Sequence, residues 1–282
     1  MLGLIIVAII FGIIEGITEW LPVSSTGHLI LFEEILPRYV SKDVWDMFLV
    51  IIQLGAILAS VILFWNKIWP FQKPDKPEGK GIIKKDSFIL WIKVAIATVP
   101  GVVFILLGLD EICDKYFYNS TGVAIALIVF GILFILIEKY NKKRTPKYDG
   151  LGDITYFIAL YIGLFQLLAA AFPGTSRSGA TILGALLLGV SRVAASEFTF
   201  ILAIPAMLGA SALKILDFAE KGIALQRNDI IFLSVGTVCA FVVSVLAIKF
   251  LMGYIKKHNF EVFGYYRIII GIIVILFFAI AK

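Results

Sequence analysis

Two short stretches of this sequence place acidic, hydroxyl, imidazole and guanidinium side chains inside otherwise apolar surroundings. The first, residues 15–29, reads EGITEWLPVSSTGHL, and the second, residues 166–181, reads QLLAAAFPGTSRSGAT. We call them the first break and the second break, because each interrupts an apolar segment with a proline and small polar residues. At membrane depth, unwound backbone is tolerated only where it lines a cavity. The two breaks are therefore the candidate binding site.

The first break begins with two carboxylates, Glu15 and Glu19, which stand on one face of a helix because they are four residues apart. An acidic side chain at bilayer depth costs about 2.5–3.5 kcal/mol on insertion scales. The pair therefore needs a cation, a shared proton or water. The alternative is that both side chains reach the outer interface as a solvated helix edge. We expect them instead to line a cavity, holding a divalent cation or acting as acid and base.

Hydroxyl residues and one histidine complete the first break. His28 follows Ser24, Ser25, Thr26 and Gly27 directly, and it could act as an acid or base or make only a structural hydrogen bond. Ser25 or Thr26 is expected to cap the helix that starts near Gly27, a role compatible with ligand contact.

The second break carries a phosphate-binding pattern. Arg177 stands where the first break has Thr26, and small residues surround it: Gly174, Thr175, Ser176 and Ser178. An arginine in a Gly- and Ser-rich turn that opens a helix offers a forked donor and free backbone N–H groups. The alternative is a structural ion pair of Arg177 with Glu15 or Glu19. Two such helix N-termini facing each other would attract an anion.

Composition places the chain in the membrane class. Of its 282 residues, 60% are apolar and only 16% are charged, and the mean hydropathy is +0.99. Six apolar runs have about the 17–25 residues that span a bilayer: 48–65, 88–108, 121–138, 198–216, 230–251 and 267–281. Four shorter stretches flank the breaks in pairs: 1–14, 27–36, 155–171 and 180–190. We predict an all-α polytopic membrane protein with six full transmembrane helices and two re-entrant helix-loop-helix hairpins.

The two halves of the chain correspond along their length. The matched pairs at one constant offset are Gly12 with Gly163, Glu15 with Gln166, Pro22 with Pro173, Ser25 with Ser176 and Asp46 with Glu197; Gly131 with Gly271 follows at a second offset. Each half has three full crossings and one hairpin that returns to its starting side. The second half therefore enters the membrane from the opposite face. We therefore predict a single membrane domain, 1–282, made of inverted repeats 1–145 and 146–282.

Basic residues set the orientation of this predicted topology. The loops 66–87, 139–153, 191–197 and 252–266 share one side and carry most of the lysines and arginines. The positive-inside rule places that side in the cytoplasm and both termini outside it. The net charge of +5 follows from this bias and does not indicate a nucleic-acid site. The N-terminus lacks the pattern of a cleaved signal peptide, and Cys113 and Cys239 fit neither a disulfide framework nor a zinc site.

The combination of EGITEWLPVSSTGH with a downstream PGTSRSG closely resembles the undecaprenyl-diphosphate phosphatase family, also called bacitracin-resistance proteins, over nearly the whole chain. The resemblance implies hydrolysis of undecaprenyl diphosphate to undecaprenyl phosphate and inorganic phosphate at the outer face of the bacterial inner membrane. That reaction recycles the lipid carrier for peptidoglycan synthesis and gives bacitracin resistance. The resemblance also implies that the activity depends on Mg²⁺ or Ca²⁺. The partners would be a polyprenyl diphosphate and membrane lipids, with a homodimer left open.

The family's motif residues have matches in this chain: Glu15 and Glu19; Ser24, Ser25, Thr26 and His28; and Arg177. We expect Arg177 and the N–H groups of both breaks to hold the diphosphate while the two carboxylates carry the metal or orient a reacting group. Ser25 is the favoured nucleophile, and His28 is its base or the acid for the leaving phosphate. His28 itself or an activated water remains an alternative nucleophile. The expected substrate-binding residues are Ser24, Thr26, Gly27, Gly174, Thr175, Ser176 and Ser178.

Two other classes compete with this interpretation. An acid-phosphatase-like lipid phosphatase would need a histidine six residues after the arginine of SRVAASEF, where this chain has Phe198. A transporter or lipid flippase shares the architecture of inverted repeats and broken helices. Simple anion binding does not need the concentration of Glu15, Glu19, Ser25 and His28 in one break, so we favour an enzyme.

Overall fold

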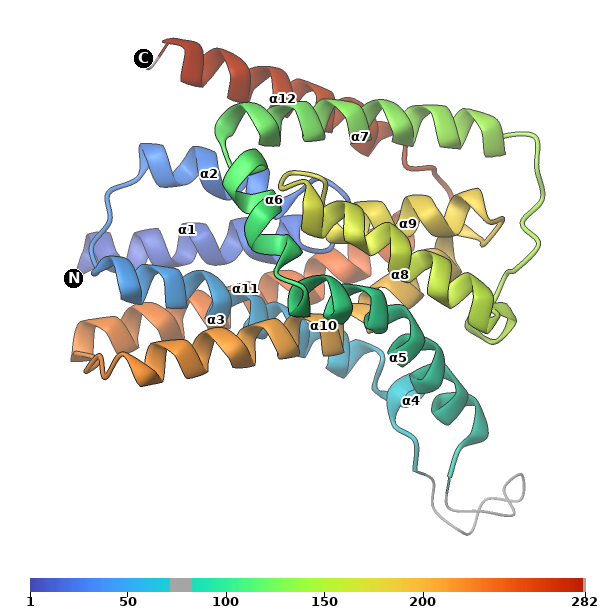
Figure 1. Ribbon diagram of the computed structural model, residues 1–282, viewed down its shortest axis with the longest axis horizontal. Helices are drawn as coiled ribbons and strands as arrows, with labels where there is room; N and C mark the ends of the chain where they lie inside the picture. Colours follow the sequence, from blue (N-terminus) through green and yellow to red (C-terminus); the bar gives the residue numbers. More distant parts are fainter. Residues whose placement is uncertain (72–82, 281–282) are drawn as a thin grey trace.

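The computed structural model describes residues 1–71 and 83–280, which form helices and no β-strand (Figure 1). The helices are α1 (Leu2–Thr18), α2 (Ser25–Ile35), α3 (Lys42–Leu63), α4 (Trp65–Ile68), α5 (Lys85–Leu106), α6 (Leu109–Phe117), α7 (Ser120–Asn141), the 3-10 helix η1 (Leu151–Asp153), α8 (Tyr156–Ala171), α9 (Arg177–Leu187), α10 (Arg192–Glu220), α11 (Arg227–Tyr254) and α12 (Glu261–Ile280). Residues 72–82 of the predicted loop 66–87, and residues 281–282, lie outside the described residues.

Six of the helices that the structure describes are long and apolar enough to cross a membrane: α3, α5, α7, α10, α11 and α12. They coincide with the six predicted runs, so the prediction of an all-α protein with six spans is confirmed. The four helices beside the breaks are shorter, with 17 residues in α1, 11 in α2, 16 in α8 and 11 in α9. The breaks therefore join pairs of short helices.

Prolines explain where the short helices α1 and α8 end. Pro22 follows the end of α1 at Thr18, and Pro173 follows the end of α8 at Ala171. A proline disfavours helical backbone in the residue before it and lacks the N–H that a continuing helix would need. Trp20 then holds the first break in place, because it is fully buried and packs edge-to-face on Phe200 of α10 with ring centroids 5.1 Å apart.

The short helices pack in the middle of the bundle, and both chain termini lie at the same end of it (Figure 1). α1 packs on α11, α8 packs on α5, and α7 packs on α12. Gly12 lets α1 approach closely, since a Cβ there would lie 2.6 Å from the carbonyl oxygen of Gly236 in α11. Gly163 of α8 faces the carbonyl oxygen of Ala97 in α5 in the same way.

Helix ends differ from the sequence prediction in two respects. α3 and α10 begin about two turns before the apolar runs that predicted them, because Ser41 and Ser191 accept hydrogen bonds from the N–H groups of Val44 and Ala194 and so cap these polar first turns. The segment around Cys113, which lies between two predicted spans and which we expected to be an outer loop, is helix α6, with acidic residues in its first turn and a lysine in its last, as the helix dipole favours. Both cysteines are free thiols.

Candidate active site

Both breaks end in a serine with an unusual backbone. Ser24 has φ 73° and Ser176 has φ 69°, and they are the non-glycine residues with positive φ in the described chain. Each serine caps the helix that follows: Ser24 Oγ accepts from the N–H of Gly27 at 3.3 Å, and Ser176 Oγ accepts from the N–H of Gly179 at 3.1 Å. Strained backbone of this kind persists only where the surrounding structure enforces it, and it concentrates at functional sites.

The observed caps correct two expectations. The cap of α2 is Ser24, not Ser25 or Thr26. Because Ser24 and Ser176 occupy equivalent positions, Arg177 corresponds to Ser25 and not to Thr26. The second break has one more residue between its proline and its cap. Gly174, with φ 97°, adopts the left-handed backbone in this longer segment.

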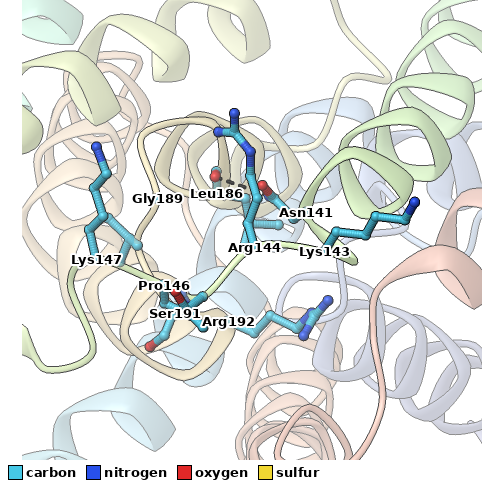
Figure 2. A pocket seen from close by; sticks show the side chains of 11 residues that line it. Asn141, Lys143, Arg144, Pro146, Lys147, Leu186, Gly189, Ser191 and Arg192 are labelled. Atoms are coloured by element: carbon cyan, nitrogen blue, oxygen red, sulfur yellow. Dashed lines mark hydrogen bonds between the residues drawn. The ribbon is translucent and has the colours of Figure 1, made fainter.

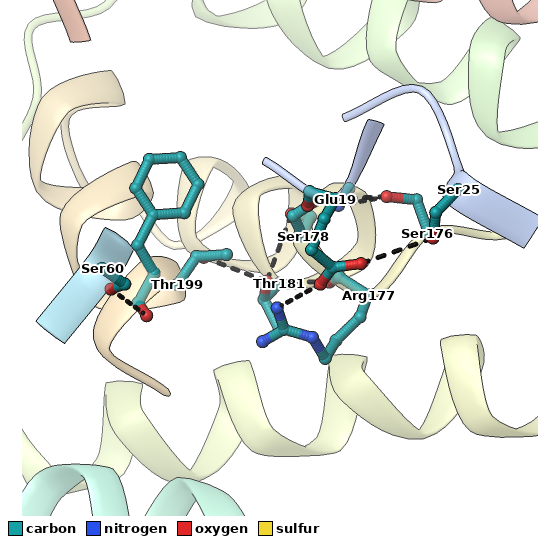
Figure 3. A network of polar contacts seen from close by, with 10 residues as sticks. Glu19, Ser25, Ser60, Ser176, Arg177, Ser178, Thr181 and Thr199 are labelled. Atoms are coloured by element: carbon teal, nitrogen blue, oxygen red, sulfur yellow. Dashed lines mark hydrogen bonds and ion pairs between the residues drawn. The ribbon is translucent and has the colours of Figure 1, made fainter. Parts of the chain in front are cut away.

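Glu19 joins the two breaks (Figure 3). Its Oε1 accepts from Nη2 of Arg177 at 2.7 Å, and its Oε2 accepts from Oγ of Ser25 at 3.4 Å. The backbone oxygen of Glu19 also accepts from Oγ of Ser178 at 3.0 Å. Three predicted catalytic residues are thus in contact although Arg177 lies far along the chain. The ion pair is the arrangement that sequence reasoning kept as the alternative role of Arg177.

Several buried polar atoms around this ion pair have no hydrogen-bond partner among the described residues. Glu15 is fully buried, and neither of its carboxylate oxygens has a partner. The same holds for Nη1 of Arg177, Oγ1 of Thr175 and Oε1 of Gln166. Buried polar groups are normally paired, so unpaired ones need an explanation such as a ligand or an ion. All four residues lie in the two breaks; Gln166 and Arg177 also line the cavity between them, whereas Glu15 and Thr175 do not.

A cavity of about 280 Å³ opens between the breaks. Its polar wall consists of Glu19, Ser25, Thr26, Gln53, Gln166, Ser176 and Arg177, and its remaining wall of Gly101, Ile105, Ala169, Ala170, Gly174, Ala206, Met207 and Ala210. One side is therefore hydrogen-bonding and the other is apolar or small. This suits a ligand with a polar anionic end and a hydrocarbon end.

His28 forms hydrogen bonds with residues other than Ser25. Its Nδ1 lies 2.7 Å from the backbone oxygen of Ser24, and its Nε2 lies 2.7 Å from the hydroxyl oxygen of Tyr266 in α12. The expected pairing of Ser25 with His28 as its base is therefore not present as a hydrogen bond in this structure, and it stays a prediction. The side chain that accepts a hydrogen bond from Ser25 is Glu19.

Arg267 of α12 was not among the predicted site residues. Its side chain is fully buried and bonds to backbone oxygens of both breaks: Pro22 at 3.2 Å, Gly174 at 3.0 Å and Thr175 at 2.8 Å. It therefore fixes the two breaks relative to each other. The signal was present in the sequence, since an arginine in an apolar transmembrane run marks a functional position.

A second cavity, of about 380 Å³, lies at the basic end of the bundle and contains no predicted site residue (Figure 2). Its charged lining residues are Lys143, Arg144, Lys147 and Arg192, with no carboxylate among them. Glu138, which pairs with Arg192, is buried and does not line this cavity. This cavity offers positive charge, but none of the acid and base groups that the cavity between the breaks has.

A bundle of membrane-type helices with a carboxylate, serines and an arginine around one cavity defines a membrane-embedded protein whose cavity suits an anionic ligand. The chain belongs to the family described as "Bacitracin resistance protein BacA", whose pattern matches residues 8–273. Family membership, which the motifs of both breaks predicted, is confirmed.

Similar proteins from several bacteria carry one name. The chain is 55% identical to "Undecaprenyl-diphosphatase" of Enterococcus faecalis, over 98% of both chains. It is 54% identical to the protein of that name from Desulfitobacterium hafniense, over 96% of this chain and 95% of the relative. It is 53% identical to the one from Acetivibrio thermocellus, over 97% of both. The similarity therefore extends over both breaks and all six long helices.

Proposed function

We propose that this protein hydrolyses undecaprenyl diphosphate to undecaprenyl phosphate and inorganic phosphate at the outer face of the bacterial inner membrane. The reaction would recycle the lipid carrier for peptidoglycan synthesis and give bacitracin resistance. The observation that carries the proposal is the contact of Glu19 with both Ser25 and Arg177 at the cavity between the breaks. Family membership and the name of the similar proteins support it.

The cavity's donors would hold the diphosphate. Nη1 of Arg177 is free of protein partners while Nη2 holds Glu19, so the guanidinium has a face left for a phosphate oxygen. The first turns of α2 and α9 present backbone N–H groups at the positive ends of their helix dipoles. Hydroxyls of Thr26, Ser176 and Ser178 stand beside them, and the apolar wall would receive the start of the prenyl chain.

Ser25 is the nucleophile that the contacts favour. Its Oγ would attack the terminal phosphorus while its proton passes to Oε2 of Glu19, and the phosphorus–oxygen bond to undecaprenyl phosphate would break. Water would then release phosphate from Ser25 and return the serine proton. His28 is kept as the acid for the leaving phosphate, because the hydrogen bond that Ser25 donates goes to Glu19 and not to His28. Attack by His28 or by water directly is the alternative that the experiments below address.

A divalent cation, Mg²⁺ or Ca²⁺, fits Glu15 and Glu19. Glu15 lies in the last turn of α1 and Glu19 is the C-cap of that helix, and the Glu15 carboxylate has no protein partner in the described structure. Mg²⁺ usually takes one or two carboxylates and completes its shell with phosphate oxygens and water, so these two side chains would suffice once the diphosphate is present. When bound, such a cation offsets charge on the phosphate oxygens.

The helix arrangement supports inverted repeats, 1–145 and 146–282, within one membrane domain. Under this proposal α1, α2, α3, α5 and α7 correspond to α8, α9, α10, α11 and α12. The packing of α1 on α11 then corresponds to that of α8 on α5, each made close by an equivalent glycine, Gly12 or Gly163. The pairs α1–α2 and α8–α9 would be re-entrant hairpins from opposite faces. Both termini would lie outside the cytoplasm.

Phosphate release by the purified protein tests the function. In detergent with undecaprenyl diphosphate and Mg²⁺, the unmodified protein should release inorganic phosphate, and Ser25→Ala should not. Ser191→Ala is the matched control, because Ser191 is also a serine at a helix start but lies at the basic end of the bundle. Binding of the substrate without phosphate release would instead favour a lipid transporter. A stable homodimer, detected by mass in detergent, would be an additional feature and not a requirement.

A further inference from the structure

Tyr266 of α12 has a close and well-aligned contact with His28. The phenol oxygen lies 2.7 Å from Nε2 of His28. The two rings are nearly parallel, with an interplanar angle of 7° and centroids 5.6 Å apart. The two residues are 238 positions apart in the chain, so the contact forms only when α12 packs beside α2. Arg267, the next residue, bonds to both breaks.

The two hydrogen bonds of the ring determine its tautomer. The backbone oxygen of Ser24 can only accept, so the Nδ1 atom that lies 2.7 Å from it carries the proton. A neutral imidazole has one N–H, so Nε2 carries the lone pair and accepts from the Tyr266 hydroxyl. The phenol oxygen can also accept when Nε2 gains a proton. The contact can therefore persist in both protonation states of His28.

We propose that Tyr266 is a positioning residue for the proposed hydrolysis, one that holds His28 in the Nδ1–H tautomer with Nε2 as the nitrogen that exchanges protons. This inference rests on the proposed function. Ser24, the cap of α2, fixes one nitrogen and Tyr266 fixes the other, so the ring cannot rotate without losing a hydrogen bond. Partners of this kind, which orient a catalytic or ligating histidine, typically change activity about 10–100-fold when they are removed.

Tyr266→Phe removes the hydroxyl and keeps the ring, so it tests the hydrogen bond separately from the stacking. We expect the variant's kcat for phosphate release to fall about tenfold or more, with KM and melting temperature nearly unchanged. A matched control exists at the basic end of the bundle, where Tyr254 stacks on His258 with centroids 4.4 Å apart but without a bond from its hydroxyl to the ring. Tyr254→Phe should leave kcat unchanged.

Nitrogen-15 NMR of histidine-labelled protein reads the tautomer directly, and the sequence has only two histidines. His28 should give the Nδ1–H tautomer in the unmodified protein, and Tyr266→Phe should shift its Nε2 signal while the His258 signals stay in place. An Nε2–H tautomer for His28, or an unchanged Nε2 signal, would overturn the proposal even if a variant folds poorly. So would an unchanged kcat in Tyr266→Phe. Absence of phosphate release by the unmodified protein would contradict the proposed function, but leave the NMR result intact.

Discussion

Replacing Arg267 should separate the two breaks, since its guanidinium bonds to three backbone oxygens of Pro22, Gly174 and Thr175. Each hydrogen bond from a charged donor contributes about 1.5–3 kcal/mol, so Arg267→Met forfeits roughly 4.5–9 kcal/mol in gross terms. Removing the desolvation cost of a fully buried cation offsets several kcal/mol of that loss. We expect a net loss of about 2–4 kcal/mol in the free energy of unfolding.

Arg267→Lys tests geometry separately from charge. A lysine keeps the positive charge, but its single ammonium group cannot reproduce the planar fork that reaches both breaks. We expect a lower melting temperature and a kcat reduced about tenfold or more, because a displacement of about 1 Å between the catalytic groups can cost that much or more. Detergent melting curves and phosphate release measure the two effects.

Arg192→Lys is the matched control for Arg267→Lys. Arg192 also joins distant helices, through its ion pair with buried Glu138, but it lies at the basic cavity. Its variant should lose stability and keep the kcat of the folded fraction. An Arg267→Lys protein with unchanged melting temperature and unchanged kcat would refute the reasoning that this residue holds the breaks together.

Two further predictions follow from the same geometry. Ser24→Ala should cost about 0.5–2 kcal/mol of stability through the lost cap, whereas Ser25→Ala should lower turnover by orders of magnitude with little loss of stability; a fully active Ser25→Ala protein would place the nucleophile elsewhere. Chelation should abolish phosphate release and Mg²⁺ or Ca²⁺ should restore it, since unpartnered Glu15 stands beside Glu19; full activity in excess chelator would exclude the metal.

Much of this architecture could be predicted from the sequence because hydrophobic length is a strong signal. Six long apolar runs predicted six long helices, and two prolines inside short polar stretches predicted the breaks. The joining of Glu19 to Arg177 was foreseen only as an alternative, since a charged pair inside a membrane has few other ways to be satisfied. Isolated charges in apolar surroundings therefore indicated which side chains could pair.

Other features of the site could not be predicted from the local sequence. Arg177 was matched with Thr26 instead of Ser25 because the second break has one more residue between its proline and its cap, and a single inserted residue changes which side chains are equivalent. The partner of His28 could not be found from spacing, because Tyr266 reaches it only through the packing of α12. Arg267 was visible as a charge in an apolar run, but its targets are backbone oxygens, and backbone acceptors carry no sequence signature.

The central claim is that Glu19 and Arg177 form one active site across the two breaks, and a double-mutant cycle on phosphate release tests it most directly. Glu19→Gln and Arg177→Lys should each lower kcat/KM by about 10²-fold or more. Because the two side chains act together, the double variant should be little worse than either single variant. Losses that multiply in the double variant, or a single variant with unchanged kcat/KM, would contradict the account.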